Sequence, residues 1–176
     1  MRGKVLIIDD DPDILKGLKD RAELLGFCPL TAESGEKGLG LLEKNTPSLF
    51  LLDLALPEMT GLDVLREIIK LQGEPRMENP KTGQNAKWSS LPVIVLTAHG
   101  TLDNAIQAMK LGAYDFLTKP FEMDHLTLVI EKALERESLK KQVEQLRAEV
   151  DAPFDTIIYW PGATDSRIVA SRQASS

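Results

Sequence analysis

The chain has 176 residues, and its hydrophobic fraction of 43% and charged fraction of 27% are typical of a globular protein rather than a disordered or fibrous one. The formal net charge of -6 argues against a broad nucleic-acid-binding face. A single cysteine, Cys28, excludes an internal disulfide, and no apolar run approaches the roughly 20 residues of a membrane span. The N-terminus lacks the pattern of a signal peptide, so we expect a cytoplasmic protein of one domain with an appendage.

Short apolar runs alternate with amphipathic stretches along most of the chain. The apolar runs predict strands at residues 5–8, 27–31, 49–53, 92–96 and 113–118. The amphipathic stretches predict helices at residues 12–25, 33–44, 62–71, 101–111 and 121–150. Asp11 is expected to cap the first helix, with Pro12 at its first position. Gly38 and Gly40 predict a weak or irregular second helix, since glycine costs up to about 1 kcal/mol relative to alanine.

This alternation predicts an α/β fold with a parallel sheet covered by helices on both faces. Five strand–helix units fit a doubly wound (βα)5 sheet of flavodoxin type, with strand order 2-1-3-4-5 and an extended C-terminal helix. In that order, the carboxyl ends of strands 1, 3, 4 and 5 converge on one crevice. The residues at those ends are Asp9, Asp10, Asp53, Thr97 and Lys119.

The residue types in this crevice point to phosphate chemistry. Three carboxylates close together repel one another by several kcal/mol at an intermediate dielectric, and a hard divalent cation such as Mg²⁺ removes that repulsion. A lysine supplies a positive charge suited to phosphate, and a threonine hydroxyl supplies a hydrogen bond. Together they favour phosphoryl transfer onto an aspartate. The alternative is an ion-paired cluster that only holds strand ends together.

Several short motifs, in order along residues 3–135, carry a resemblance to a known family. The chain resembles the receiver domain of bacterial two-component response regulators. The motifs are Asp9-Asp10, Asp53 followed by Pro57 and Gly61, Thr97-Ala98, and Lys119-Pro120.

The resemblance implies that Asp53 accepts a phosphoryl group from a sensor histidine kinase. It also implies that Asp9, Asp10, Asp53 and the backbone carbonyl of Ala55 hold Mg²⁺ or Mn²⁺. The chain is accordingly expected to act as a phosphoacceptor that gains and loses its own phosphoryl group, and not as a turnover enzyme.

The resemblance gives the other crevice residues a role in switching. Thr97 is expected to bond the phosphoryl group and move toward it, while Lys119 pairs with its charge. Phe116 stands where the family places an aromatic switch residue, and it lacks the hydroxyl of the commoner tyrosine. The bond between Lys119 and Pro120 is expected to be cis.

Three parts are expected along the chain. Residues 1–135 form the receiver domain, with an unusually long loop at 73–90, and residues 153–176 form a tail that is partly disordered. Between them, residues 136–152 form a helical linker. Leu139, Val143, Leu146 and Val150 repeat there with spacings of 4, 3 and 4, which favours a two-stranded parallel coiled coil without requiring one.

The linker also bears on output. Residues 133–150 are similar to the helical linker of sigma-54-dependent activators, and Phe154–Ile158 resembles the opening of their ATPase module, a resemblance that fails at Tyr159-Trp160. The sequence contains neither a helix-turn-helix pattern nor a phosphate-binding Gly-x-x-x-x-Gly-Lys-Ser/Thr loop. We expect a homodimer, formed through the face of the fourth helix, fifth strand and fifth helix and through the C-terminal helix. Control of transcription is the leading output, and a stand-alone signalling adaptor is the alternative.

Two other classes share parts of this pattern. A phosphatase of the haloacid dehalogenase type needs a second acid two residues after its nucleophile, where this chain has Ala55. A flavodoxin-like electron carrier needs a phosphate-binding loop of hydroxyls and glycines after the first strand, where this chain has aspartates. His99 and His125 are expected to be surface residues without a catalytic role.

Overall fold

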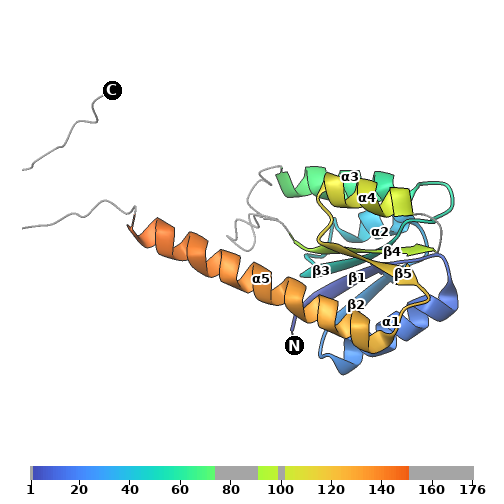
Figure 1. Cartoon of the computed structure of the whole chain (residues 1–176), viewed down its shortest axis with the longest axis horizontal. Coiled ribbons are helices and arrows are strands. Elements are labelled where there is room, and N and C mark those ends of the chain that lie inside the picture. Colours follow the sequence, from blue (N-terminus) through green and yellow to red (C-terminus); the bar gives the residue numbers. More distant parts are fainter. Residues whose placement is uncertain (1, 74–90, 99–101, 151–176) are drawn as a thin grey trace, which may run out of the picture.

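The structure, a computed structural model, describes residues 2–73, 91–98 and 102–150, and in them strands alternate with helices (Figure 1). The strands are β1 (Lys4–Ile8), β2 (Cys28–Ala32), β3 (Leu49–Asp53), β4 (Val93–Ala98) and β5 (Asp115–Lys119). The helices are α1 (Pro12–Leu24), α2 (Gly35–Leu41), α3 (Gly61–Gly73), α4 (Leu102–Leu111) and α5 (Met123–Val150). The predicted order of elements is confirmed.

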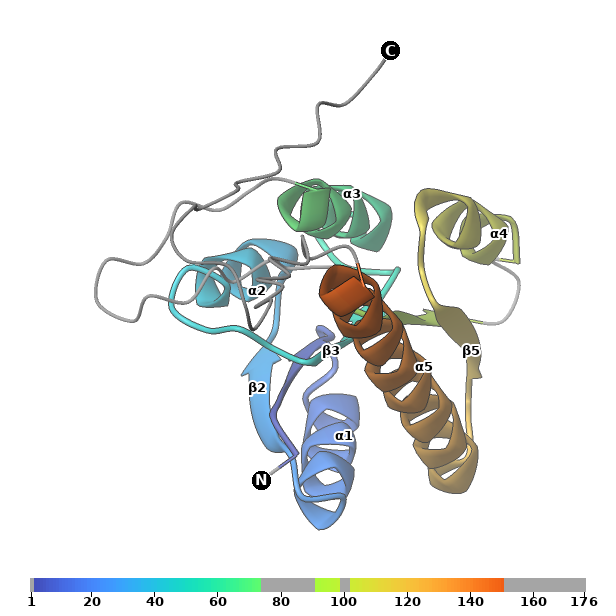
Figure 2. The same cartoon turned by 90° about the vertical axis from the view of Figure 1, so that its left-hand side faces the viewer.

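All neighbouring strands pair in parallel, in the order β2-β1-β3-β4-β5, as predicted. Helices α1 and α5 cover one face of the sheet, and α2, α3 and α4 cover the other (Figure 2). Alternate strand residues face the two layers: Leu6 and Phe50 pack under α2 and α3, while Ile7 and Leu51 pack under α1 and α5. Every residue of β3 is buried, which explains its continuous apolar sequence.

Local signals explain how two of the helices form. Asp11 accepts hydrogen bonds at Oδ1 from the N–H groups of Asp13 and Ile14, and Pro12 occupies the first turn of α1, as predicted. Helix α2 is only seven residues long, which agrees with the prediction of a weak helix. Gly38 lies so close to β1 that a Cβ atom there would be 2.8 Å from Ile8 Cγ1, whereas Gly40 faces open space.

Element boundaries differ from the prediction by up to three residues, the largest difference being at the end of α2, which was predicted at residue 44 and lies at Leu41. Helix α3 continues to Gly73, so the first residue assigned to the loop at 73–90 is helical. Strand β4 extends through Thr97 to Ala98, and β5 begins at Asp115 because Ala113 bonds back to Ala108 to close α4. The remainder of that loop, His99 and the tail at 153–176 lie outside the described residues.

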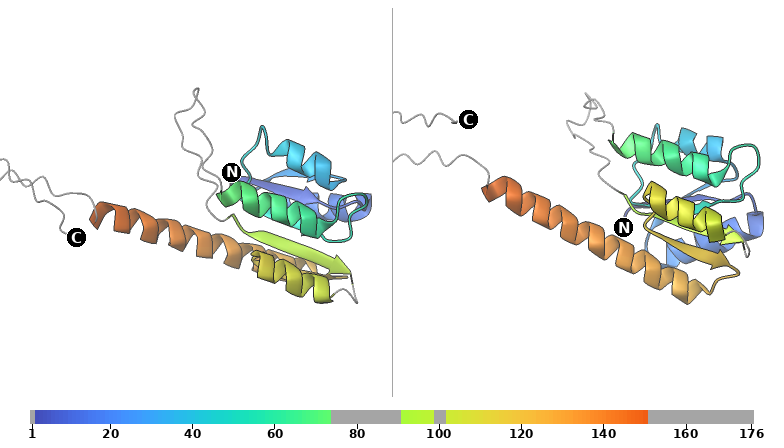
Figure 3. Two further views of the ribbon diagram at one scale, coloured as in Figure 1. Left: turned by 90° about the horizontal axis from the view of Figure 1, so that it is seen from above. Right: turned by 45° about the horizontal axis from the view of Figure 1, so that its top comes forward.

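Helix α5 starts near the carboxyl end of β5 and runs back past the amino ends of the strands, so that its second half projects from the body (Figures 1 and 3). Leu126, Ile130 and Ala133 are buried against the sheet. Leu139 and Leu146, farther along, are exposed. Within the described residues, neither α5 nor any other helix combines the length and the apolar character needed to span a bilayer.

Candidate functional site

The crevice at the carboxyl end of the sheet is centred on Lys119. Its Nζ atom donates hydrogen bonds to Asp9 Oδ2 at 2.7 Å and to Asp53 Oδ2 at 2.6 Å. Asp9 follows β1, Asp53 ends β3 and Lys119 ends β5, so one ammonium group joins three strands. The side chains of Asp9 and Asp53 are 0% and 5% exposed, and that of Lys119 is 17% exposed. The cluster therefore contains two carboxylates and one ammonium group, is largely buried, and has one excess negative charge when both carboxylates are ionised.

Backbone amides orient the two buried carboxylates in the same way. Asp9 Oδ1 accepts a hydrogen bond from the N–H of Asp11 at 3.0 Å, and Asp53 Oδ1 accepts one from the N–H of Ala55 at 3.0 Å. Each carboxylate thus bonds the amide two residues ahead through one oxygen and Lys119 through the other. This pattern is the Asx turn, which aspartate forms readily where a strand ends.

Burial and pairing act in opposite directions on the protonation of these groups. Burial raises the pKa of Asp9 above its ordinary value of 3.8, although the hydrogen bonds from Lys119 and Asp11 oppose the shift. Burial by itself would lower the pKa of Lys119, but its hydrogen bonds to Asp53 and Asp9 outweigh burial and raise that pKa above 10.5. Lys119 therefore stays charged, and Asp9 carries an electrostatic cost that a further cation would relieve.

Asp10 adds a third carboxylate at this point. It is exposed, and ligand oxygens of Asp9, Asp10 and Asp53 all lie within 4.8 Å of one another. A group of carboxylate oxygens beside open solvent is the donor set that a hard cation such as Mg²⁺ prefers, because Mg²⁺ keeps several water ligands. The residues present therefore fit a magnesium site.

Thr97 lies at the neighbouring strand end, where it is only 2% exposed. In the sheet register Asp53 of β3 is paired with Leu96 of β4, so Thr97 lies one residue farther toward the carboxyl end of the sheet than Asp53 does. Its hydroxyl donates a long hydrogen bond of 3.5 Å to the carbonyl of Ala98. All five crevice residues predicted from the sequence are thus at adjacent strand ends.

Comparisons with known proteins agree with this arrangement. The model of the response regulator receiver domain family matches residues 5–131. The chain belongs to this family. Phosphorylation of an aspartate is the general function of its receiver domains.

Among the similar proteins, the regulatory protein AtoC of Escherichia coli K12 is 32% identical to the receiver chain over 143 residues, which are 81% of this chain and 28% of AtoC. A receiver domain structure from Clostridium thermocellum is 37% identical with a TM-score of 0.64, covering 78% of this chain and 98% of that chain. A structure of NtrX from Brucella abortus is 31% identical with a TM-score of 0.72, covering 89% of this chain and 32% of that chain. AtoC and NtrX are sigma-54-dependent activators, in line with the resemblance of the linker.

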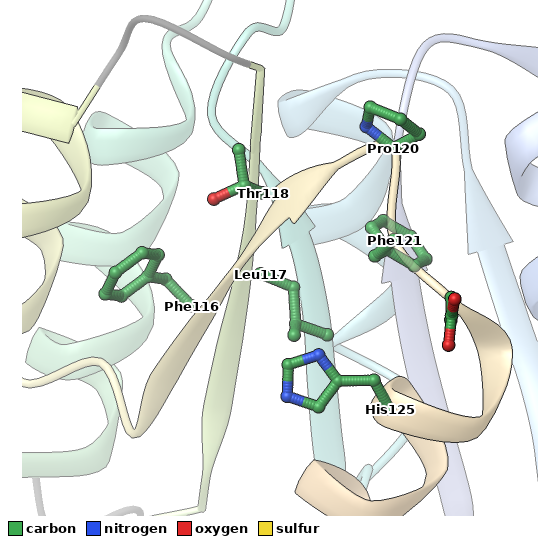
Figure 4. A pocket seen from close by; sticks show the side chains of 7 residues that line it. Phe116, Leu117, Thr118, Pro120, Phe121 and His125 are labelled. Atoms are coloured by element: carbon green, nitrogen blue, oxygen red, sulfur yellow. The ribbon is translucent and has the colours of Figure 1, made fainter.

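Phe116, the expected switch residue of the receiver domain, is partly buried against the core under α2, α3 and α4. A surface pocket of about 570 Å³ runs from Phe116 along β5 to the first turn of α5 (Figure 4). Phe116 and Thr118 lie on one side of β5, while Leu117 lies on the side of His125 and α5. His125 is exposed, as predicted. The bond between Lys119 and Pro120 is cis, also as predicted.

Sequence reasoning did not identify two contributions to the receiver site. The amides of Asp11 and Ala55 orient Asp9 and Asp53, but a backbone amide leaves no side-chain signature. The Asx-turn tendency of aspartate at a strand end was the only available signal. Lys119, which is expected to pair with a phosphoryl group, joins two carboxylates in this structure, an arrangement that the ion-paired alternative had included.

Proposed function

We propose that the chain is a phosphorylation-controlled switch in which Asp53 accepts a phosphoryl group from the phosphohistidine of a sensor kinase in the cytoplasm. A carboxylate oxygen of Asp53 forms the new O–P bond as the N–P bond of the donor breaks, and the electron pair of that bond stays on the imidazole. The observation that carries this proposal is the hydrogen bond that Lys119 donates to Asp53 in a crevice that also holds Asp9 and Asp10.

The metal would be Mg²⁺ or Mn²⁺, held by Asp9, Asp10, Asp53 and the carbonyl of Ala55. When bound, it neutralises charge on the phosphoryl oxygens and on the carboxylates. The N–H of Ala55 already bonds Asp53, which keeps this backbone segment beside the carboxylate. The carboxylates of Asp9, Asp10 and Asp53 outnumber the single ammonium group of Lys119, and this excess of negative charge supports the assignment of a metal cation to the crevice.

The remaining residues would respond to the added charge. Lys119 is free to exchange one carboxylate for a phosphoryl oxygen, because its ammonium group donates several hydrogen bonds. Thr97, the next β4 residue beyond Asp53, would donate its hydroxyl to another phosphoryl oxygen. Movement of Thr97 would open space beside β5 that the ring of Phe116 can fill. These roles are those of a phosphoacceptor with a conformational output.

Chemical phosphorylation tests the proposal without a kinase. The chain is incubated with Mg²⁺ and acetyl phosphate, and its intact mass is measured. We expect one added phosphoryl group on the unaltered chain and none on Asp53→Asn, which keeps the shape and the bond to Ala55. Equal labelling of the two proteins would contradict the assignment of Asp53.

The exposed half of α5 supports self-association. Leu139, Val143 and Leu146 are 55%, 47% and 61% exposed, which is unusual for aliphatic residues at regular helical spacing. The spacing places Leu139 and Leu146 at heptad position d and Val143 at position a. A β-branched residue at a with leucine at d favours two parallel strands. The occupant we propose for this apolar seam is the same seam of a second copy.

Charges beside the seam also favour the parallel arrangement. In the same heptad frame Glu135 takes position g, and Lys140 takes the e position of the next heptad. These positions meet between the strands of a parallel pair, where glutamate and lysine attract each other. In an antiparallel pair, e positions face e positions, so that Lys140 and Arg147 would repel each other.

Sedimentation of the full chain, with and without a phosphoryl mimic, tests the dimer. Leu139→Ser combined with Leu146→Ser should yield monomers. Leu24→Ser is the matched control, because Leu24 is 82% exposed on α1 and lies off the seam. Glu135→Lys should weaken the dimer, and adding Lys140→Glu should restore it. A monomer in both states of the unaltered chain would contradict the dimer, and failure of the double swap to restore association would contradict its orientation.

The face formed by α4, β5 and α5 is the second contact we propose between copies. Ile106 and Met109 on α4 are 43% and 40% exposed, and Leu128 on α5 is 49% exposed. This face lies beside Phe116, so a change at the switch residue would alter it. Ile106→Ser should reduce only the phosphorylation-dependent part of association.

We propose residues 1–135 as the receiver domain, 136–152 as the linker and 153–176 as a separate tail. Burial of Ala133 and the stacking of Arg136 over Tyr114, with 5.7 Å from guanidinium to ring centroid, support a boundary near residue 136. The output we propose is control of transcription, because the relatives include transcriptional regulators. The alternative output is that of a stand-alone signalling adaptor. This alternative would be favoured if the phosphorylated chain captured another protein while its self-association stayed unchanged.

A further inference from the structure

Gly61, the first residue of α3, lies against the backbone that carries Asp53. A Cβ atom at Gly61 would be 2.5 Å from Leu54 Cα and 2.9 Å from the carbonyl carbon of Asp53, and closer still to the Asp53 carbonyl oxygen. These distances are well inside van der Waals contact. The obstructing atoms belong to the main chain, so they cannot rotate away as a side chain would.

The backbone conformation of Gly61 does not itself require glycine. Of the glycines in the described ranges, those with positive φ are Gly3, Gly26 and Gly112. Alanine is favoured over glycine in a helix by roughly 1 kcal/mol. Lack of space therefore explains the glycine at the start of α3.

The segment against which Gly61 packs is held from two sides. The N–H of Leu54 donates to the carbonyl of Leu96 in β4 at 3.0 Å, and the N–H of Gly61 donates to the carbonyl of Leu54 at 3.2 Å. Asp53 directly precedes Leu54, and its carboxylate accepts a hydrogen bond from Lys119. Any shift that makes room for a side chain at Gly61 would move the main chain of Asp53 or lift α3 away from it.

We propose that Gly61 is a positioning residue for phosphoryl transfer, because its bare Cα lets α3 begin against the peptide that carries Asp53 and so fixes the acceptor carboxylate. This inference rests on the proposed function of Asp53. A misplacement of about 1 Å at a reacting group costs on the order of a hundred-fold in rate, so we expect Gly61→Ala to slow labelling by roughly ten- to a hundred-fold.

Two other glycines provide matched controls. Gly3 has a φ of 112° and packs on Ser48 just before the amino end of β1, at the opposite edge of the sheet, so Gly3→Ala should destabilise the fold without touching the site. Gly40 has no atom within 4 Å of its Cβ position, so Gly40→Ala should be harmless. Gly40→Ala can also be combined with Gly61→Ala in one protein, where its gain in helix stability should offset part of the stability that Gly61→Ala loses.

The experiment compares these variants with the unaltered chain in three measurements: folded fraction by circular dichroism, MgCl2 affinity by calorimetry, and labelling rate with acetyl phosphate. We expect Gly61→Ala, at a temperature where it is fully folded, to lose both labelling rate and Mg²⁺ affinity, while Gly3→Ala keeps both. The inference is overturned if the two variants label at equal rates, or if Gly61→Ala does not fold even with Gly40→Ala. No label on the unaltered chain would instead overturn the proposed function itself.

Discussion

Lys119 donates a 2.6 Å hydrogen bond to Asp53 Oδ2, which joins the end of the edge strand β5 to the end of the central strand β3. The same ammonium group bonds the buried Asp9. Removing one member of a buried pair leaves the other charge without compensation, and the loss is larger than for an exposed pair. Lys119 therefore compensates the charge of both carboxylates before any phosphoryl group arrives.

Lys119→Met should lower the free energy of unfolding by roughly 3 kcal/mol in the absence of Mg²⁺, because Asp9 and Asp53 lose their cation. Added Mg²⁺ should recover more stability in this variant than in the unaltered chain. The control is Lys37→Met, since Lys37 pairs with Glu33 on the surface, where water screens the pair and its loss should cost little stability. Urea unfolding measures both, and equal losses in the two variants would contradict the structural role of Lys119.

Asp10→Asn should weaken Mg²⁺ binding while leaving the metal-free protein as stable as before or slightly more so. Asp10 is exposed, and its removal takes one negative charge from a crowded group. Thermal unfolding with increasing MgCl2 should show a clear rise in Tm for the unaltered chain and a much smaller one for the variant. Coinciding titrations of the two proteins would contradict a metal site that includes Asp10.

The placement of the site could be predicted because parallel strands bring their carboxyl ends to one edge. Asp9, Asp53 and Lys119 needed only a correct strand order to be brought together. The particular bonds of Lys119, to one oxygen of each of two carboxylates, could not be predicted, because they depend on side-chain conformation within the folded crevice. The reason for glycine at position 38 could not be predicted either. Helix propensity shows that glycine destabilises a helix, but it does not show that α2 lies close to Ile8.

Gly38 and Gly40 should respond oppositely to alanine. Gly40→Ala should stabilise the protein by about 0.5–1 kcal/mol, because it restricts the unfolded chain and meets no obstacle. Gly38→Ala should destabilise it, because the new methyl group would overlap the side chain of Ile8. Denaturant unfolding separates the two signs, and a stabilising Gly38→Ala would show that α2 can move away from β1.

Thr60 and Asp63 at the start of α3 provide a prediction of pH dependence. The hydroxyl of Thr60 donates to Asp63 Oδ2 at 2.6 Å and is the largest single cause that holds the pKa of Asp63 below 3.8; the hydrogen bond and the charge of Arg66 are separate, smaller causes. Because this pKa is depressed in the folded state, the contact stabilises the fold above pH 3.8, and that contribution is lost as the pH falls through the folded pKa.

Thr60→Ala should therefore raise the pKa of Asp63 toward its ordinary value, and the variant should lose less stability than the unaltered chain on acidification below pH 3.8. Arg66→Gln is the comparison and should shift the pKa less. NMR titration of the Asp63 carboxyl carbon measures both variants. A larger shift in Arg66→Gln would mean that the ion pair, and not the hydroxyl, governs this carboxylate.

We propose that Asp53, and no other carboxylate in the crevice, carries the phosphoryl group. After reaction with acetyl phosphate and Mg²⁺, borohydride reduction converts an aspartyl phosphate to homoserine, which marks its position for peptide mass spectrometry. We expect the mark on Asp53 alone. A mark on Asp9 or Asp10 would contradict it.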